Sequence, residues 1–285
     1  NVKNDRTLIA AMALRRRVPL VVVLLLIAGA SVAWAQRFRV MEGPGMPLRM
    51  PPPRFSDGAF TICKLIFTSN RREANGFGWS IDYPFSGLNL MLRSSELTRT
   101  RISRDGKGEA RYWTVHLSDE TLFGCPFLVA SDVGTIDLAP IEVARLREYL
   151  LKGGFLWVDD YWGTRASAQF EDAMREVLPE FQPFDIPLDH PIRRTLFQVN
   201  EVPQVPGINF WRATGGGTAE RGTDSPFADF RGIADGHDRL MVVMTHNTDI
   251  GDSMERESED PEFFAEFSPK GYAVTIDMVL YALTH

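Results

Sequence analysis

Short apolar runs bounded by turn-forming residues predict two buried strands near the middle of the chain, at residues 127–131 and 155–158. Between these runs, Pro140 suits the first turn of a helix, and apolar residues then recur at helical spacing. A glycine pair at residues 153–154 is typical of a helix end. A strand, a helix and a strand joined by short connections predict a parallel βαβ unit.

Further segments extend this alternation toward both ends of the chain. The runs at residues 61–67 and 240–245 are apolar and rich in β-forming residues, so each predicts a buried strand. Residues 88–92, 170–178 and 273–283 predict helices that pack against a sheet. The whole pattern predicts an α/β fold, a three-layer sandwich with a mainly parallel sheet.

The first 35 residues have the pattern of a secretory signal. A basic cluster at residues 15–17 precedes an apolar run at 18–30, and residues 33–35 form a small-x-small cleavage motif. We expect cleavage after residue 35, with translation starting at Met12 as an alternative to a longer leader. The other interpretation is an uncleaved anchor in the inner membrane. Both predict an exported protein whose body is periplasmic or otherwise extracytoplasmic.

Composition limits the classes of protein that fit the rest of the chain. Residues 36–59 are rich in proline and predict an extended spacer, which leaves residues 60–285 as a single α/β domain. Hydrophobic residues make up 44% and charged residues 24% of the 285 residues, as in a globular protein. The net charge of −6 argues against a general nucleic-acid binder. Two cysteines are too few for a disulfide scaffold or a four-thiolate zinc site.

The two cysteines have different positions relative to the predicted strands. Cys63 lies inside a strand, where a packed core thiol is the favoured interpretation. Cys125 comes just before its strand. A disulfide between them is the alternative, and an oxidising compartment would permit it.

Polar residues follow the carboxyl ends of the predicted strands, where open parallel sheets bind ligands. Neighbouring strands lie about 4.8 Å apart, so these ends are expected to share one cleft. Carboxylates together with a histidine are ligands for a hard divalent ion. The candidate metal ligands are Asp132, Asp159, Asp160 and His246. The candidate ligand cleft comprises Trp79, Asp82, Tyr83, Asp132, Asp159, Asp160, His190, Asn247 and Asp249.

Several of these residues also have a structural interpretation. Aspartate at a strand-to-helix junction commonly caps a helix or a turn, which would account for Asp132, Asp159 and Asp249. His190 precedes a proline and is typical of a turn. Trp79 would serve equally to seal the sheet edge. Metal-ligand spacing such as H-E-x-x-H is missing from the sequence.

Nucleophilic catalysis finds little support in the sequence. Neither G-x-S-x-G nor G-x-C-x-G occurs, and Ser131 is flanked by Ala130 and Asp132 rather than by glycines. The glycines at 215–217 are not followed by the Lys-Ser/Thr pair of a phosphate loop. A divalent metal is therefore the one cofactor for which the sequence offers candidate ligands.

Several short segments occur in an order that resembles a known family. They are Gly78-Trp79 with Asp82-Tyr83-Pro84, Cys125-Pro126-Phe127-Leu128, Leu146-Arg147-Glu148-Tyr149-Leu150 with Gly153-Gly154-Phe155-Leu156 and Asp159-Asp160, Asp189-His190-Pro191-Ile192, and Tyr281-Ala282-Leu283. Together they resemble the bacterial family called domain of unknown function 4159, over about residues 60–285.

This resemblance implies a flavodoxin-like fold similar to class I glutamine amidotransferases, and no established activity. Relatives tend to be encoded near MoxR-type ATPases and von Willebrand-type proteins, which implies protein partners in the cell envelope. The chain departs from the family at Ser131-Asp132, where relatives often have Gly-His. It also lacks the elbow cysteine of true amidotransferases, so their activity is not carried over.

Three functional expectations follow, and the third is recognition of a carbohydrate or of peptidoglycan, because sugars stack on aromatic faces such as those of Trp79, Tyr83, Tyr161 and Trp162. The first is a non-catalytic binding or scaffold module of the bacterial envelope, with protein partners such as a MoxR-type ATPase system. It would bind no nucleic acid and would contact the membrane only through an uncleaved N-terminal segment. The alternative is a metal-dependent hydrolase whose ion is held by Asp132, by Asp159 or Asp160, and by His246.

Overall fold

The computed structural model describes residues 48–74 and 76–285. The expected signal at residues 1–35, and the part of the expected spacer up to residue 47, lie outside the described residues. Among the residues that the structure describes, none of the helices has both the length and the apolar character that a membrane span requires.

A seven-stranded sheet forms the centre of the described body, with strand order β3-β1-β4-β6-β9-β8-β7. The first five strands in this order run parallel to one another, whereas β8 is antiparallel to β9 and β7 is antiparallel to β8. The predicted α/β class with a mainly parallel sheet is therefore confirmed. The strands are β1 (Ile62–Ile66), β3 (Tyr112–His116), β4 (Phe127–Ser131), β6 (Leu156–Asp159), β7 (Phe184–Asp185), β8 (Asp229–Ala234) and β9 (Leu240–His246). The short β2 (Thr68–Ser69) and β5 (Ile136–Asp137) pair separately.

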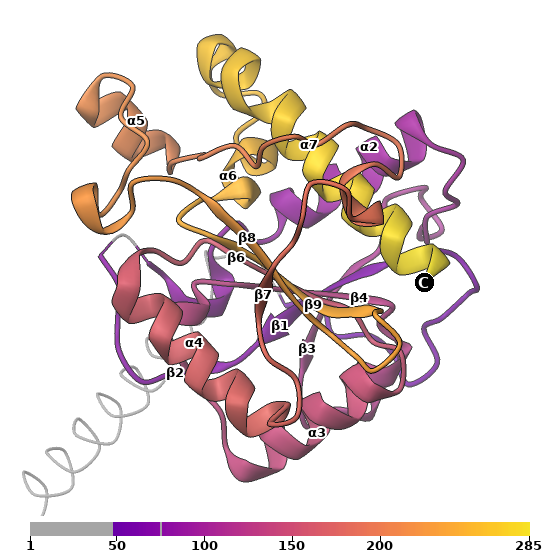
Figure 1. The fold of residues 1–285 in the computed structure, drawn as a ribbon. Helices are drawn as coiled ribbons and strands as arrows, with labels where there is room; N and C mark the ends of the chain where they lie inside the picture. Colours follow the sequence, from indigo (N-terminus) through magenta and orange to yellow (C-terminus); the bar gives the residue numbers. More distant parts are fainter. Residues whose placement is uncertain (1–47, 75) are drawn as a thin grey trace, which may run out of the picture. The chain divides into compact units, whose positions relative to one another are not determined.

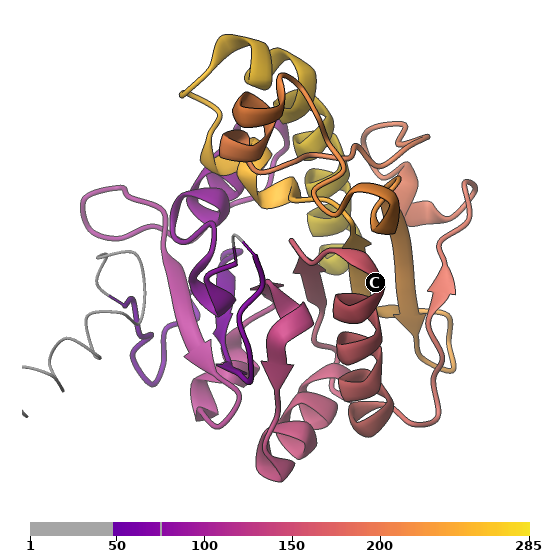
Figure 2. The same ribbon diagram turned by 90° about the vertical axis from the view of Figure 1, so that its left-hand side faces the viewer.

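Helices cover both faces of this sheet and make three layers (Figure 1). One face carries α2 (Phe85–Leu97), α6 (Ile250–Glu255) and α7 (Pro261–Thr284), which contact one another. The other face carries α3 (Pro140–Leu151) and α4 (Gly163–Val177). A view turned by 90° shows α5 (Ile208–Thr214) on the same side of the sheet as α6 and α7 (Figure 2). Short 3₁₀ turns complete the chain at η1 (Gly78–Ser80), η2 (Glu120–Gly124), η3 (Val133–Thr135), η4 (Pro191–Arg193) and η5 (Gly222–Asp224).

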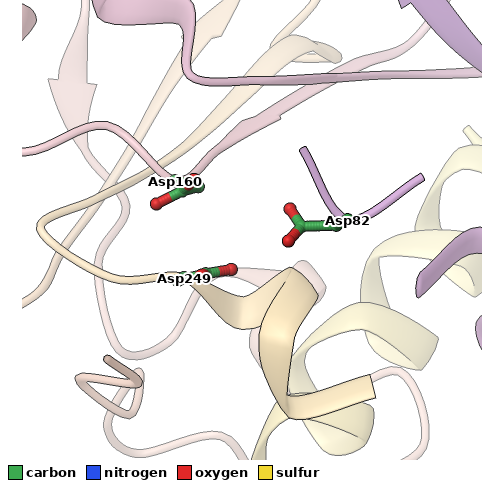
Figure 3. Close-up of side chains that lie close together, drawn as sticks. All are labelled: Asp82, Asp160 and Asp249. Atoms are coloured by element: carbon green, nitrogen blue, oxygen red, sulfur yellow. The ribbon is translucent and has the colours of Figure 1, made fainter. Parts of the chain in front are cut away.

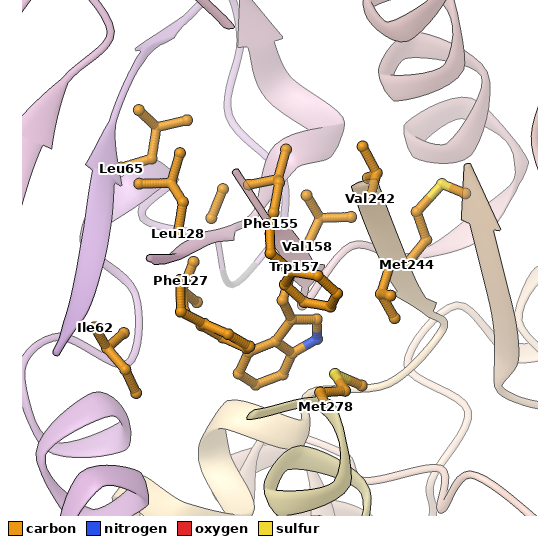
Figure 4. Close-up of a cluster of buried hydrophobic side chains, with 14 of the residues drawn as sticks. Ile62, Leu65, Phe127, Leu128, Phe155, Trp157, Val158, Val242, Met244 and Met278 are labelled. Carbon is orange, nitrogen blue, oxygen red and sulfur yellow. The ribbon is translucent and has the colours of Figure 1, made fainter. Parts of the chain in front are cut away.

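The central strands are buried along their whole length, because helices shield them on both sides. Figure 4 shows side chains of β1, β4, β6 and β9 packed with one another and with Met278 of α7. Trp157 is the largest of the fully buried side chains, and its indole N–H donates to Thr245 Oγ1 at 2.9 Å. The bulk of the tryptophan therefore fills the core without leaving a polar group unsatisfied.

The chain reverses its direction of winding between β1 and β4. From β1 it passes through α2 to β3 at one edge of the sheet, and it then returns to β4 on the other side of β1. The connections that leave β1 and β4 therefore diverge at the carboxyl edge of the sheet. In open α/β sheets this divergence creates the crevice in which ligands bind.

The cysteines depart from the favoured expectation. Cys63 and Cys125 form a disulfide, with their Cα atoms 5.8 Å apart, so the interpretation of Cys63 as a packed core thiol is wrong. The pairing follows from the strand register. Ile62 of β1 lies opposite Phe127 of β4, so Cys63 and Cys125 sit close to this aligned pair. Cys125 can therefore bond to Cys63 although it lies just before β4 and not inside the strand.

Candidate functional site

Three buried aspartates meet beyond the carboxyl edge of the sheet. One carboxylate oxygen from each of Asp82, Asp160 and Asp249 lies within 4.8 Å of the other two. The three side chains point toward one another from three separate segments (Figure 3). Their exposed fractions are 5%, 7% and 3%. We refer to these three residues as the acidic trio.

Sharp backbone turns at the ends of elements place the acidic trio. Asp82 lies between η1 and α2, and Asp160 directly follows β6; both have left-handed backbones, with φ of 61° and 51°. Aspartate tolerates this region better than most residues. Asp249 follows β9 and caps α6, where its Oδ1 accepts from the backbone N–H of Asp252 at 2.8 Å. The capping interpretation is therefore confirmed at Asp249, which leaves its second oxygen for other contacts.

Among the described residues, one fully buried oxygen of the acidic trio has no hydrogen-bond partner. Asp160 Oδ1 accepts from the indole of Trp162 at 2.9 Å. Asp82 accepts a hydrogen bond from the Ser131 hydroxyl. Its other oxygen, Oδ2, is fully buried and has no hydrogen-bond partner among the described residues. A buried polar atom without a partner is costly, so the position of Asp82 points to a ligand that this oxygen would bind.

Lys64 provides the positive charge beneath the trio. It lies in the middle of β1, is 1% exposed, and donates from Nζ to Ser131 Oγ at 2.6 Å. Burial lowers the pKa of its ammonium group, whereas the negative charges of Asp82, Asp159, Asp160 and Asp249 act to raise it. One lysine therefore faces four carboxyl groups, so the site has a deficit of positive charge.

This deficit is reflected in the protonation of the carboxyl groups. Burial raises the pKa of Asp160 and of Asp249 well above the usual value, and the negative charge of neighbouring aspartates raises both further. Burial also raises the pKa of Asp82, although Lys64 opposes the shift. A cation bound among these groups would take the place of their protons.

A second acidic group shares Asp82 but already has a counter-ion. Asp82, Asp252 and Glu255 also bring one oxygen each within 4.8 Å. The guanidinium of Arg256 lies 3.2 Å from Asp252 Oδ1 and 3.1 Å from Glu255 Oε2, and Asp252 Oδ2 accepts from the Ile208 N–H at 2.6 Å. Arg256 therefore gives Asp252 and Glu255 a counter-ion, whereas the Asp82 that both groups share keeps its partnerless Oδ2.

The predicted metal ligands do not all gather in one place. Asp160 belongs to the acidic trio. Asp159 instead accepts from the Gly251 N–H at 2.7 Å and from Thr245 Oγ1 at 2.5 Å. His246 binds Asp229 through Nδ1 at 2.8 Å and contacts the Gly163 carbonyl through Nε2 at 3.1 Å.

Asp132 stands apart from the trio in the same crevice. Its Oδ2 accepts from the Gly78 N–H at 2.7 Å. Its charge acts on Asp160 and helps to raise the pKa of that residue. Asp132 itself has a pKa raised to about 6, chiefly by burial. It is thus a neighbour of the trio and belongs to neither of the two groups that could hold an ion.

The remaining cleft candidates have structural partners. Asn247 accepts from the Gly163 N–H at 2.8 Å, and His190 Nδ1 accepts from the Ile192 N–H at 3.2 Å at the start of η4. The turn interpretation of His190 is therefore confirmed. Trp79 and Tyr83 are buried, and their rings pack together with Tyr112 of edge strand β3. They seal this end of the sheet.

Sequence reasoning missed Lys64, which sits inside the apolar run of β1. A lysine inside a buried strand is itself a signal, because lysine is almost never fully buried without a partner. The sequence prediction also placed Asp82 and Asp249 in a broad ligand cleft and did not identify them as ligands of one ion. Their convergence depends on how the turns after η1 and β9 fold.

The fold and site define an α/β protein with a mainly parallel sheet and a buried carboxylate cluster at its carboxyl edge. The family model described as Domain of unknown function (DUF4159) matches residues 71–283. This match covers most of the chain, so the protein belongs to that family. A comparison with curated proteins found no match to the chain.

Proposed function

We propose that this protein binds a hard divalent cation at the acidic trio. The single observation that carries the proposal is the partnerless carboxylate of Asp82: its Oδ2 is buried and has no hydrogen-bond partner among the described residues, and one Asp82 oxygen lies within 4.8 Å of an oxygen of Asp160 and of Asp249. A cation would supply the missing partner. It would also balance the negative charge that Lys64 leaves uncompensated.

The donor atoms favour particular ions. All three ligands are carboxylate oxygens, with no cysteine or histidine in the group. Oxygen ligands of this kind suit Mg²⁺, Ca²⁺ and Mn²⁺ better than Zn²⁺ or Cu²⁺. We therefore propose a magnesium- or calcium-type site.

Isothermal titration of metal-free protein with MgCl₂, CaCl₂ and MnCl₂ tests this proposal. We expect one cation per chain, and we expect Asp160→Asn to lower the affinity by at least about tenfold, since loss even of an outer-shell partner commonly costs that much. Asp137→Asn, at an exposed aspartate of β5, is the matched control and should bind like the unmodified protein. Equal affinity in all three proteins, or no binding to any, would overturn the proposal.

Hydrolysis is a second candidate function, favoured by one further observation. Burial raises the pKa of Asp159 to about 7, and this residue directly precedes Asp160. A carboxyl group with a pKa near neutrality is suited to act as a general base. Turnover of chromogenic phosphate or carboxylate esters by the cation-loaded protein, with loss in Asp160→Asn, would support it. No turnover would leave cation binding as the function.

The finer relationship of the fold is also a proposal. The five parallel strands, numbered along the chain, have the order 2-1-3-4-5, which is the flavodoxin-like order. This order supports the expected similarity to class I glutamine amidotransferases. The chain has no elbow cysteine, and Ser131 is flanked by Ala130 and Asp132 rather than by glycines, so we propose the likeness for the architecture alone.

Export remains a proposal that the disulfide supports. Bonds such as Cys63–Cys125 persist in oxidising compartments and are rare in the cytosol. The expected role as an envelope scaffold with a protein partner, including a MoxR-type ATPase system, stays an untested prediction. A cation site is compatible with that role.

A further inference from the structure

Two arginines from distant parts of the chain converge on one glutamate at the carboxyl edge of the sheet. Arg71 Nη1 pairs with Glu73 Oε1, and Arg221 Nη2 lies 3.7 Å from Glu73 Oε2. The side chains of Arg71, Glu73 and Arg221 are 15%, 15% and 20% exposed. The carboxylate of Glu73 is thus held between two guanidinium groups that are largely shielded from water.

The two guanidinium groups are held in place independently of Glu73. Arg71 donates to Gln169 Oε1 of α4 at 3.0 Å and to the Gly134 carbonyl at 2.5 Å. Arg221 donates to the Ala74 carbonyl at 2.8 Å, and its Nη1 lies 3.6 Å from Oε2 of the buried Glu220 side chain. Removing the Glu73 carboxylate would therefore leave two positioned guanidinium groups, of which Arg221 keeps its ion pair with Glu220. Guanidinium groups arranged in this way match the oxygens of a phosphate or a carboxylate.

The arginine pair lies beside the start of α4. Arg221 passes over the first residue of α4, where a Cβ on Gly163 would lie 3.6 Å from Arg221 Cγ. This end of the helix already attracts a carboxylate of the chain itself, because Asp224 accepts from the Thr164 N–H at 3.1 Å and from its hydroxyl at 2.5 Å. Carboxylate binding at this edge of the sheet therefore already occurs within the chain, at the positive end of the helix dipole.

The arginine pair adjoins the crevice at which the winding of the sheet reverses. Arg71 binds the carbonyl of Gly134 in η3, which directly follows β4. The charges of both arginines act to lower the pKa of Asp132, and the charge of Asp132 acts to raise the pKa of Asp160 in the acidic trio. An anion bound by the arginines would therefore lie in the region of the fold that parallel sheets use for ligands.

We propose that Arg71 and Arg221 form a binding site for the phosphoryl group of a ligand, and that Glu73 occupies this site when the ligand is absent. A phosphate carries up to two negative charges at neutral pH, compared with one on the glutamate, so it can displace the internal carboxylate. The site is distinct from the acidic trio and does not depend on a bound cation.

The test uses inorganic phosphate as the probe, in buffer with chelator so that no cation takes part. Isothermal titration compares the unmodified protein with Glu73→Gln and Arg221→Gln. If Glu73 fills the site in about nine molecules of ten, then Glu73→Gln should raise the apparent affinity about tenfold, because the competent fraction rises to one. Arg221→Gln should abolish the binding.

Matched controls come from another arginine–glutamate pair on the surface. Arg147 and Glu180 form an ion pair at 2.6 Å that lies apart from the crevice. Glu180→Gln and Arg147→Gln should leave phosphate binding unchanged. Circular dichroism and thermal unfolding of each variant would show that it is folded.

The outcomes separate this site from the cation site. Binding that Glu73→Gln strengthens and Arg221→Gln removes would support the proposal, whether or not the acidic trio binds a cation. Equal binding by Glu73→Gln and the unmodified protein would overturn the role of Glu73. Binding that survives in Arg221→Gln, or no binding in any folded variant, would overturn the site itself and identify the three side chains as a structural ion-pair cluster.

Discussion

At the scale of single residues, Asp132 provides a sharp test of the electrostatics in the crevice. Its pKa rises from 3.8 to about 6, mainly because of burial, so the folded protein takes up a proton that the unfolded chain does not bind between these pH values. The contribution of Asp132 to the free energy of unfolding must therefore fall as the pH rises from about 4 to 6, and it stays lower above that interval. Asp132→Asn keeps the acceptor for Gly78 and removes the ionisation. We expect this variant to be more stable by on the order of 2 kcal/mol at pH 7.5 and unchanged near pH 4.

Urea denaturation at the two pH values measures this difference, and Asp137→Asn is the exposed control. Asp132→Asn also distinguishes Asp132 from the acidic trio. Because Asp132 is not one of the three ligands, this variant should lose much less cation affinity than Asp160→Asn. A destabilised variant at pH 7.5 would contradict the assigned burial effect.

The sequence predicted carboxylates at this edge, since Asp132 and Asp160 both follow recognisable strands. It could not reveal Lys64 or the partnerless oxygen of Asp82, because both depend on distances between segments far apart in the chain.

At the scale of elements, the start of α6 holds the acidic trio in position. A Cβ added to Gly251 would lie 2.5 Å from Asp82 Oδ2, closer than packed atoms can approach. Gly251→Ala should therefore displace the Asp82 carboxylate and lower the cation affinity by at least about tenfold, as displaced ligands do. Alanine favours a helix over glycine, so the loss would not come from a weaker α6. Gly236→Ala, in an open turn with no atom within 4 Å, should bind the cation normally.

Titration calorimetry of both glycine variants would decide this point, and equal affinities would show that the trio tolerates movement of Asp82.

The elements that the sequence predicted had clear signals: β4, α3 and β6 combine buried runs with a proline at the start of the helix and glycines at its end. The edge strand β3 and the antiparallel β8 lack such continuous apolar runs, since each alternates buried and partly buried residues. The helix expected at residues 273–283 begins earlier, at Pro261 of α7, because Asp260 caps it and Pro269 does not end it.

At the scale of the whole molecule, the disulfide links the stability of the fold to the compartment in which it works. Cys63 and Cys125 are separated by 62 residues, and closing a loop of that size stabilises a protein by about 4 kcal/mol in the chain-entropy account. Replacing both cysteines with serine should lower the free energy of unfolding by about this amount, as measured by urea denaturation. Thiol titration of unfolded protein should find no free thiol before reduction and two afterwards.

The same bond makes export testable without identifying a ligand. An exported chain should appear in the periplasmic or extracellular fraction, with both cysteines resistant to alkylation until a reductant is added. A chain recovered from the cytosol with two reactive thiols would contradict both the signal prediction and the disulfide. A cytosolic chain with an intact disulfide would contradict export alone. The Cys63–Cys125 bond joins β1 to the start of β4, and these two strands also carry the hydrogen-bonded Lys64 and Ser131 next to the acidic trio. Export and the disulfide are therefore tested on the same two strands that border the crevice.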